Sequence, residues 1–539
     1  MPSLHQLGLA LRTARHLRPQ QLAAQLAHRV RGPARMPRRR RAPGIDSLAP
    51  CSVALCPSPE GRPGATGIAL VGRPPHDPTT EGWDAGANPL WAYTLHYHGW
   101  LNHPEVSTEF ARATLGHWID EHRHGVGWEP YPTSLRVLHW LGWLHRHGAE
   151  LQAFERERIF GSLAAQLDHL AAHVEVHIDG NHLWTNLVAL TTAGLALRGP
   201  LPTRLLERFE ARTVDTVHAQ LAGDGMHGER TPSYHCLLTE QLAVLSSFAR
   251  SQRPRLAHAL APALSAMLES IPAFTHPDGD VALWGDSQRN APVTPQTLLE
   301  RLGRTMPRGH ADAPVSGFAR RQWGPWSLLW NRGDVGLSHQ VGHVHGDALA
   351  IELSLGGTRV VVDAGVGTYE IGPERAYARS TAAHNTVTVG SGATDQHELW
   401  ASHRIGARAQ PQTLACADDR IVAEVRGHAS PATHRRRIEH EGEVIRVTDT
   451  LDQPNVPAVV RYFVPATLEP RLRGETVELE AAGRRVQIRA PGGRWHASDA
   501  PGWVGMGRSA PRVCLSLPLG MQGTVVEFRA LGGGPATPP

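Results

Sequence analysis

The stretch Thr358-Arg-Val-Val-Val-Asp363 is a short β-branched run that follows two glycines and ends on an aspartate, and it sets the pattern for the second half of the chain. Similar runs recur at Asn385-Thr-Val-Thr-Val389 and Val456-Pro-Ala-Val-Val-Arg-Tyr-Phe463, separated by Gly, Pro and Asp. Alternating runs of this length predict antiparallel strands. We therefore expect residues 316–535 to form an antiparallel β-sandwich.

The residues before this region follow a different pattern. Between about 91 and 315 apolar residues recur at helical spacing, as in Leu135, Leu138, Leu141 and Leu144, with Pro or Gly between the runs. This pattern predicts a stack of helical hairpins. A helical domain followed by a β domain, without βαβ alternation, is an α+β multidomain layout.

Residues 1–90 are expected to form a basic N-terminal helix and a Pro/Arg-rich linker with a few short strands. Residues 1–45 hold ten arginines, including Arg38-Arg39-Arg40-Arg41, and no Asp or Glu. A nucleic-acid or membrane-surface arm is one interpretation, and a basic amphipathic helix with a linker is the other. Arginines at 12, 15 and 18 interrupt the apolar spacing, which predicts neither an export signal nor a membrane span. The expected location is cytoplasmic by sequence, with periplasmic as the alternative by family analogy.

Composition excludes several kinds of chemistry. The 539 residues include no lysine, so all 54 basic residues are arginine, and a Walker-type phosphate loop or a Schiff-base lysine is excluded. The five cysteines are odd in number and scattered, at 51, 56, 236, 416 and 514. This spacing fits neither a disulfide framework nor a cysteine-based zinc site.

Two polar stretches in the helical region are candidates for a site. Trp128-Glu-Pro-Tyr-Pro-Thr-Ser-Leu-Arg136 places a Trp, a Tyr and an Arg at the mouth of a predicted helix, where a structural cap and a sugar-binding edge are equally good interpretations. Gly180-Asn-His-Leu-Trp-Thr-Asn186 begins another predicted helix. Asn181 and His182 can flank an anion at a helix N-terminus, or they can be a simple cap.

Two further stretches lie downstream. In Asp224-Gly-Met-His-Gly-Glu-Arg-Thr-Pro-Ser-Tyr234, glycines and a proline interrupt the helical pattern, which favours a functional loop. His343-Val-His345-Gly-Asp347 is followed by Asp363, Tyr369, Tyr377 and Ala383-His384-Asn385. Strand alternation would place His343 and His345 on the same face, as in a metal site, although chance pairs are expected among 33 histidines. A cupin is excluded because no glutamate lies about four residues beyond the second histidine.

Taken in order, the four stretches resemble the heparinase II/III-like polysaccharide lyases, over roughly residues 90 to 530. The runs Gly346-Asp-Ala-Leu-Ala-Ile-Glu-Leu-Ser-Leu-Gly-Gly357, Val362-Asp-Ala-Gly365 and Arg379-Ser-Thr-Ala-Ala-His-Asn-Thr386 extend the resemblance through the β half. It implies an N-terminal (α/α) incomplete toroid, a C-terminal antiparallel β-sandwich, and cleavage of a uronic-acid-containing polysaccharide by β-elimination.

The resemblance also implies roles for single residues. Asn181 and His182 resemble the pair that neutralises the uronate carboxylate, Tyr234 the tyrosine acid/base, and His343 the histidine opposite it. This division is chemically sound, because the C5 proton becomes acidic only when hydrogen bonds absorb the enolate charge. The resemblance assigns one structural Zn²⁺ to His345, Asp363 and His384, and the other expected substrate contacts are Trp128, Tyr131, Arg136, Glu229, Arg230, Tyr369, Tyr377 and Trp400.

Several alternatives stay open at this point. Either Tyr369 or Tyr377 can be a second acid/base. Family members carry a Glu-Asn pair shortly after the Asn-His, but Thr185 occupies the acidic position here. The alternative function is an exopolysaccharide, capsule or lipopolysaccharide assembly protein with the same fold. A glycoside hydrolase needs two carboxylates, for which Glu229 and Asp224 are candidates. The expected partner is an acidic polysaccharide and not a nucleic acid, and the oligomeric state is undetermined.

Overall fold

The structure, a computed structural model, describes residues 4–31, 44–50, 57–64, 67–83, 89–390 and 396–532. The chain divides into two compact units. We call residues 18–221 and 237–266 the helical unit, and residues 1–17, 222–236 and 267–539 the β unit. This division follows contacts in space, whereas the linear boundaries at about 90 and 315 remain a prediction.

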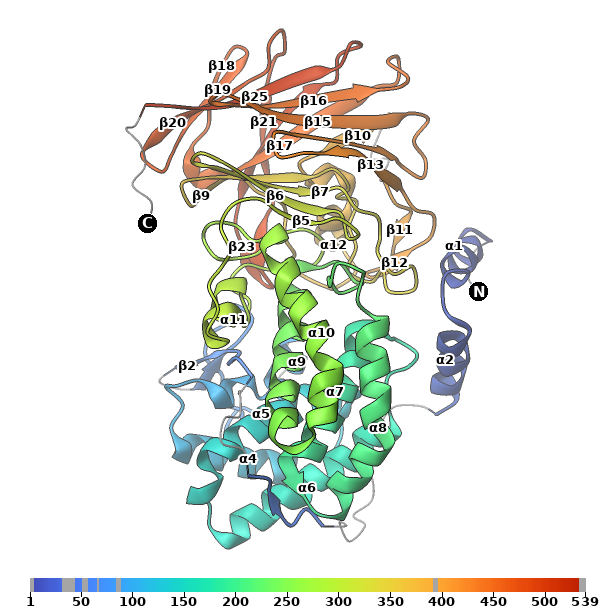
Figure 1. Ribbon diagram of the computed structural model, residues 1–539, viewed down its shortest axis with the longest axis vertical. Coiled ribbons are helices and arrows are strands. Elements are labelled where there is room, and N and C mark those ends of the chain that lie inside the picture. Colours follow the sequence, from blue (N-terminus) through green and yellow to red (C-terminus); the bar gives the residue numbers. More distant parts are fainter. Residues whose placement is uncertain are drawn as a thin grey trace. The chain divides into compact units, whose positions relative to one another are not determined.

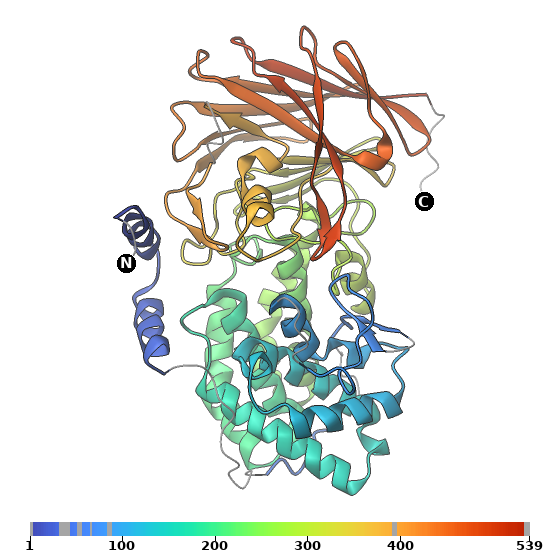
Figure 2. The same ribbon diagram turned by 180° about the vertical axis from the view of Figure 1, so that it is seen from behind.

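The helical unit consists mainly of α-helices (Figures 1 and 2). The predicted leucines of α5 are buried, with Leu138 almost inaccessible, and Leu187 in α7 is fully inaccessible. A proline at the first position of α5 and of α8 presets the helical φ angle. The helices are α2 (Pro19–Arg31), α3 (Pro89–Tyr97), α4 (Thr108–Glu121), α5 (Pro130–His147), α6 (Ala153–Ala172), α7 (Gly180–Ala196), α8 (Pro200–Ala219), α9 (Pro232–Gln252) and α10 (Pro254–Ser270), the last two extending into the β unit.

The β unit contains three larger antiparallel sheets (Figure 1). The first has the order β5 (Ala311–Ala313), β6 (Phe318–Trp323), β7 (Trp326–Asn331), β8 (Ile351–Leu355) and β9 (Thr358–Val361). The second has the order β10 (Val387–Val389), β17 (Ala458–Pro465), β24 (Arg512–Pro518) and β21 (His496–Ala500). The third has the order β13 (Gln410–Cys416), β14 (Arg420–Arg426), β15 (Thr433–Glu441), β16 (Val444–Leu451), β25 (Thr524–Leu531), β20 (Arg484–Arg489), β19 (Thr476–Ala481) and β18 (Arg471–Arg473).

One hydrophobic core joins these three sheets. It includes Leu353 from the first sheet, Val460 from the second and Ile438 from the third, all inaccessible to solvent. The predicted class, a helical region followed by an antiparallel β-sandwich, is therefore confirmed. The run that begins at Thr358 forms β9 as far as Val361, and β9 pairs with β8.

Short elements complete the description. Two of the predicted short strands, β2 (Arg62–Gly64) and β3 (Gly67–Ala69), pair in the N-terminal region, and β1 (Ser47–Leu48) pairs with β4 (Leu197–Arg198). The remaining elements are α1 (Leu4–Ala14), α11 (Pro295–Arg301), α12 (Pro373–Arg379), β11 (Leu399–Trp400), β12 (Arg404–Ile405), β22 (Trp503–Gly505) and β23 (Arg508–Ser509), besides single helical turns. The arginine run 38–41, Cys51 and Cys56 lie outside the described residues.

Among the described residues, no helix combines the length and apolar character that crossing a bilayer requires.

Candidate functional site

Two tyrosine hydroxyls meet in the β unit. Tyr234 lies in the first turn of α9, and its hydroxyl is 2.9 Å from the hydroxyl of Tyr369. Burial and the adjacent Tyr369 raise the pKa of Tyr234 well above its usual value, so Tyr234 keeps its proton at neutral pH. Tyr377 lies elsewhere, with its hydroxyl 3.4 Å from Arg512. Of the two tyrosines that were candidates for a second acid/base, Tyr369 therefore contacts Tyr234 and Tyr377 contacts Arg512 instead.

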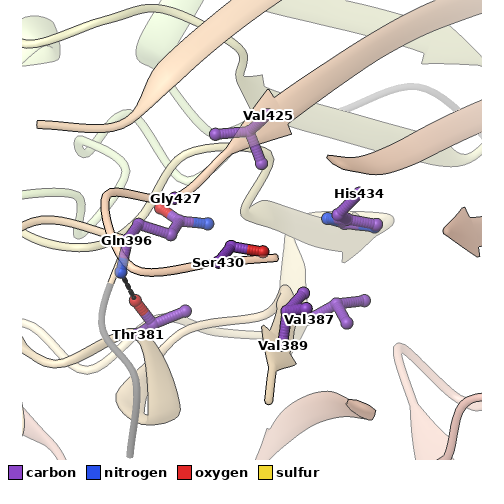
Figure 3. A pocket seen from close by; sticks show the side chains of 8 residues that line it. All are labelled: Thr381, Val387, Val389, Gln396, Val425, Gly427, Ser430 and His434. Atoms are coloured by element: carbon purple, nitrogen blue, oxygen red, sulfur yellow. Dashed lines mark hydrogen bonds between the residues drawn. The ribbon is translucent and has the colours of Figure 1, made fainter. Parts of the chain in front are cut away.

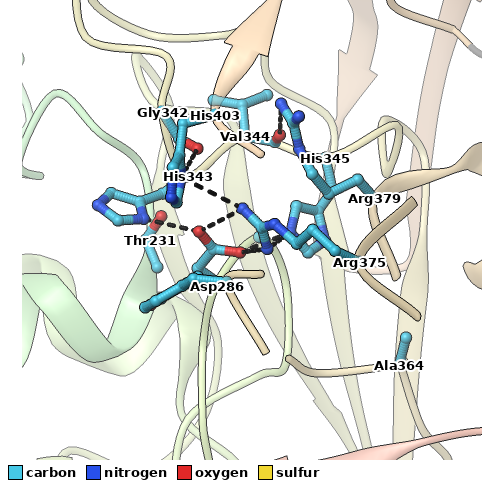
Figure 4. A network of polar contacts seen from close by, with 12 residues as sticks. Thr231, Asp286, Gly342, His343, Val344, His345, Ala364, Arg375, Arg379 and His403 are labelled. Carbon is cyan, nitrogen blue, oxygen red and sulfur yellow. Dashed lines mark hydrogen bonds and ion pairs between the residues drawn. The ribbon is translucent and has the colours of Figure 1, made fainter. Parts of the chain in front are cut away.

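His343 lies against Tyr234. The two rings are stacked with centroids 4.2 Å apart, and His343 Nδ1 is 2.7 Å from Asp286 Oδ2 (Figure 4). A carboxylate accepts hydrogen bonds, so Nδ1 carries the proton and a neutral imidazole keeps an unprotonated Nε2. Nε2 is 3.8 Å from Glu229 Oε2. A tyrosine hydroxyl and an imidazole, two groups that can exchange protons, thus lie side by side.

The strand expected at His343-Val-His345 is wrong. Both histidines lie in the irregular segment between β7 and β8, with Gly342 and Gly346 on either side. Side-chain contacts, not a strand ladder, orient them: His345 Nε2 is 2.8 Å from Asp286 Oδ1. The two histidines thus face the same carboxylate because each bonds to Asp286, and not because they alternate along a strand.

Asp286 is the residue that sequence reasoning missed. It has no solvent-exposed surface, and Arg375 donates to both of its oxygens, from Nη2 at 3.0 Å and also from Nη1. Burial alone would raise the pKa of Asp286, but the charge of Arg375 and the hydrogen bonds from His343 and His345 hold it well below its usual value. No motif marks Asp286, because its partners lie 57 or more residues away.

The expected metal ligands form a second buried group. His384 Nδ1 is 2.5 Å from Asp363 Oδ1, and the rings of His345 and His384 are 5.5 Å apart. His345 Nδ1, Asp363 Oδ2 and His384 Nε2 are each buried and have no hydrogen-bond partner among the described residues. Buried polar atoms are costly when unpaired, and two imidazole nitrogens with a carboxylate oxygen are the donor set that zinc takes. The residues fit a metal ion.

A different set of donors lies closer together. Within the described residues, the metal-competent atoms that fall within 4.8 Å of one another belong to Asp286, His343 and His403. Arg375 already neutralises this carboxylate, and its Nη2 is also 3.4 Å from His403 Nδ1. A cation there would meet the guanidinium charge at close range. The guanidinium of Arg375 thus disfavours a cation on this second set of donors.

Asn181 and His182 begin α7 in the helical unit, as expected. Asp179 caps this helix with a φ of 66°, a left-handed conformation that is rare outside glycine, and its side chain accepts from Gly180 N at 2.9 Å. His182 Nδ1 is 3.1 Å from Glu175 Oε1. Glu175 Oε2 in turn accepts from Asn186 Nδ2 at 3.1 Å. A buried glutamate that the sequence analysis did not single out thus supports the histidine.

The expected sugar contacts fall into two groups. Tyr131 packs on His182, with ring centroids 4.4 Å apart, and its contact with substrate stays a prediction. Trp128 and Arg136 are 2% and 0% exposed, so neither side chain reaches a ligand. Arg136 is held by Gln166 Oε1 at 2.8 Å and by backbone carbonyls. The expectation that these two contact substrate is corrected to a structural role.

Three further expected contacts have partners inside the β unit. Arg230 is buried and donates to Ser316 O at 2.8 Å and to Asn331 Oδ1 at 2.8 Å, so it organises its own loop. Trp400 Nε1 donates to Thr13 Oγ1 at 3.0 Å. Glu229, 6% exposed, lies beside His343.

A small, partly open cavity lies elsewhere in the β unit (Figure 3). None of the tyrosines or histidines described above lines it, and apolar side chains such as Val387 and Val425 form part of its wall together with His434. The candidate site is therefore defined by its polar contacts and not by this cavity.

Comparison with known proteins identifies related folds. Residues 305–512 match the family model described as heparinase II/III-like, C-terminal. The chain is similar to the crystal structure of heparinase III, with a TM-score of 0.67 and 15% identity over 85% of this chain and 81% of that one. It is also similar to a mutant heparan sulfate lyase from Pedobacter heparinus, with a TM-score of 0.60 and 16% identity over 88% and 81% of the two chains. No curated protein sequence matches.

Proposed function

The C-terminal part of the chain, residues 305–512, belongs to the heparinase II/III-like family, and we propose from this premise that the protein is a polysaccharide lyase. In this proposal it cleaves a uronic-acid-containing polysaccharide by β-elimination. The solved structures with a similar fold include a heparinase III and a heparan sulfate lyase. The assembly alternative has no support among these comparisons.

The observation that carries the proposal is the contact between Tyr234 and His343. A hydroxyl that keeps its proton is stacked beside an imidazole whose Nδ1 contacts the Asp286 carboxylate. β-Elimination needs both, because one group removes the C5 proton while the other protonates the leaving oxygen on C4. Tyr369, hydrogen-bonded to Tyr234, extends the pair and offers a route for returning the proton.

Asn181 and His182 hydrogen-bond the uronate carboxylate and stabilise the negative charge that develops there. His343 Nε2 accepts the C5 proton, the C4–O4 bond breaks, and Tyr234 donates its proton to O4. A C4–C5 double bond forms in the uronyl product. Proton exchange from the imidazolium of His343 to the Tyr234 phenolate restores the starting state.

Two carboxylates act through these histidines. Asp286 accepts from His343 Nδ1 and so favours the tautomer with the proton on that nitrogen. Glu175, 3.1 Å from His182 Nδ1, orients that ring so that its Nε2–H can donate to the uronate carboxylate. Glu175 comes from the segment before α7, so it offers a carboxylate although Thr185 occupies the acidic family position. We therefore propose Asp286 and Glu175 as positioning residues.

A zinc ion, when bound, is proposed to sit on His345, Asp363 and His384, where it would stiffen the segment that bears His343. It takes no part in the proton transfers. Hydrolysis is a weaker assignment because both oxygens of Asp224 are engaged, by Ser316 N at 2.7 Å and Ser316 Oγ at 2.8 Å.

The test is to incubate the purified protein with heparan sulfate, hyaluronate, chondroitin and alginate, and to follow the ultraviolet absorbance of the unsaturated uronyl product. We expect a rise on at least one polymer that is lost in Tyr234→Phe and in His343→Ala. A folded protein that produces no unsaturated product from these polymers, but still binds one of them, would instead support the assembly role. Release of saturated ends would identify a hydrolase.

A further inference from the structure

Exposed apolar side chains are concentrated in the two N-terminal helices. Thirteen large hydrophobic residues are exposed in the described part of the chain, and six of them lie in α1 and α2. They are Leu4, Leu7, Leu11, Leu22, Leu26 and Val30, with Leu4 89% and Val30 87% exposed. Apolar residues scattered singly need no explanation, but a row of them does.

In α1 the exposed leucines form one face. At 3.6 residues per turn, Leu4, Leu7 and Leu11 lie within a narrow arc, and the buried Leu9 and Thr13 lie on the opposite side. The buried side attaches α1 to the β unit, since Thr13 Oγ1 lies 3.2 Å from Ile405 O. The leucine face therefore has no role in holding this helix in place.

The helix α2 repeats the arrangement within the helical unit. Gln21 is buried and donates to Ile178 O at 3.4 Å, and Gln25 donates to His177 O at 3.4 Å. Leu22, Leu26 and Val30 recur every four residues on another, exposed side. Both helices are thus fastened largely by polar groups, while an apolar row faces solvent.

Basic residues accompany both rows. Residues 4–31 contain five arginines and no Asp or Glu. Arg12 is paired with Glu398, and Arg18 lies 3.8 Å from Asp179. Arg15 and Arg29 are exposed, have no carboxylate partner among the described residues, and lie beside the apolar rows at helical spacing.

We propose that α1 and α2 are each an anchor for an anionic lipid surface, with the leucine row of each helix inserted among the acyl chains and its arginines at the headgroups. A helix with an apolar face and flanking arginines lies in the plane of a membrane interface, and each arginine adds attraction to anionic lipid. A nucleic acid would engage the arginines but would leave six apolar side chains in water. The proposal does not depend on the lyase assignment.

Co-sedimentation with vesicles tests it directly. We expect the full-length protein to bind vesicles of phosphatidylglycerol and phosphatidylcholine, and to bind pure phosphatidylcholine vesicles much more weakly. The triple variant Leu4→Ser, Leu7→Ser, Leu11→Ser should bind the anionic vesicles at least about tenfold more weakly, because it removes most of the apolar area of α1 that would enter the membrane. The double variant Arg15→Glu, Arg29→Glu should also weaken binding about tenfold and reduce its salt dependence.

Matched substitutions elsewhere serve as controls. Leu414 and Leu472 are 42% and 41% exposed on edge strands, so Leu414→Ser, Leu472→Ser should bind as the wild type does. Arg420→Glu, Arg471→Glu is the corresponding charge control. Equal loss in variants and controls, loss in the arginine variant alone, or no vesicle binding at all would overturn the proposal. So would self-association, measured by light scattering without lipid, that the triple leucine variant abolishes, because a second copy would then cover this face.

Discussion

His343 Nδ1 and Asp286 Oδ2 lie 2.7 Å apart although 57 residues separate them in the chain. In the helical unit His182 Nδ1 and Glu175 Oε1 are related in the same way, at 3.1 Å. In each proposed histidine, Nδ1 therefore contacts a buried carboxylate. This contact orients the ring so that Nε2 points away from the carboxylate. This shared arrangement leads to the first two predictions.

Replacing Asp286 by Asn should lower kcat by about a hundredfold or more and change KM little, because the general base loses its oriented tautomer. The variant also leaves Arg375 without its charge partner, which costs about 3–5 kcal/mol of stability. Steady-state kinetics and thermal unfolding measure the two effects separately.

A matched control exists for this variant. Asp449, in the third sheet, is buried like Asp286 and bonds in the same way to a histidine and an arginine. Its Oδ1 is 2.7 Å from His434 Nε2 and 2.8 Å from Arg436 Nε. Asp449→Asn should destabilise the protein to a similar degree but leave kcat of the folded protein unchanged. If both variants lose the same fraction of kcat, Asp286 has only a structural role.

Replacing Glu175 by Gln should lower kcat/KM by about tenfold, because His182 loses the charged group that contacts its Nδ1 and orients its ring toward a uronate. The comparison is Glu240→Gln, which alters another buried glutamate of the helical unit, bonded to Ser58 Oγ. Both variants are measured by steady-state kinetics on a uronate polymer. Equal values of kcat/KM would contradict the role of Glu175 in positioning His182.

The tyrosine pair predicts an ordered set of activities. Tyr234→Phe should abolish elimination, since the proposed donor to the leaving oxygen is lost. Tyr369→Phe should reduce the rate but not abolish it, because its hydroxyl contacts the donor and not the assigned base. Tyr377→Phe should behave as the wild type, because its hydroxyl faces Arg512. Initial rates of product absorbance rank the three, and a different order would refute the assignment.

Metal content can separate the two candidate sets of donors. We expect His384→Ala to lose bound zinc, measured by elemental analysis of the purified protein, and His403→Ala to retain it. A chelator should lower the melting temperature of the wild type but not that of His384→Ala. The reverse pattern would move the metal to Asp286, His343 and His403.

The Asp449 group also predicts how stability depends on pH. Burial opposes ionisation of Asp449, but Arg436 and His434 outweigh it and lower its pKa from 3.8 to about 2. Because the folded pKa lies below the unfolded one, the stabilisation is fully present above about pH 4 and is lost as the pH falls through about 2. The shift corresponds to about 2 kcal/mol. Urea unfolding between pH 5 and pH 2 should therefore show a smaller loss in Asp449→Asn than in the wild type, each relative to its own value at pH 5.

Local sequence patterns predicted much of this molecule. Helical spacing located α5 and α7, and β-branched runs located β9, β10 and β17, because burying one face of a helix or strand imposes a period on the sequence. Polar stretches in an apolar background drew attention to His182, Tyr234 and His343. The expected strand at His343 was wrong because two histidines two residues apart produce the same period without any strand pairing.

The sequence by itself determined the fold class and the identity of the chemical groups, since both depend on residue types and on spacings of a few positions. Only the tertiary structure decided which groups meet. It placed Tyr369 and not Tyr377 on Tyr234, buried Arg136 in the core, and brought Asp286 and Glu175 under the two histidines. These contacts join residues that are distant in the chain or lie in irregular segments, and no local period records them, because they arise only when packing closes the chain on itself.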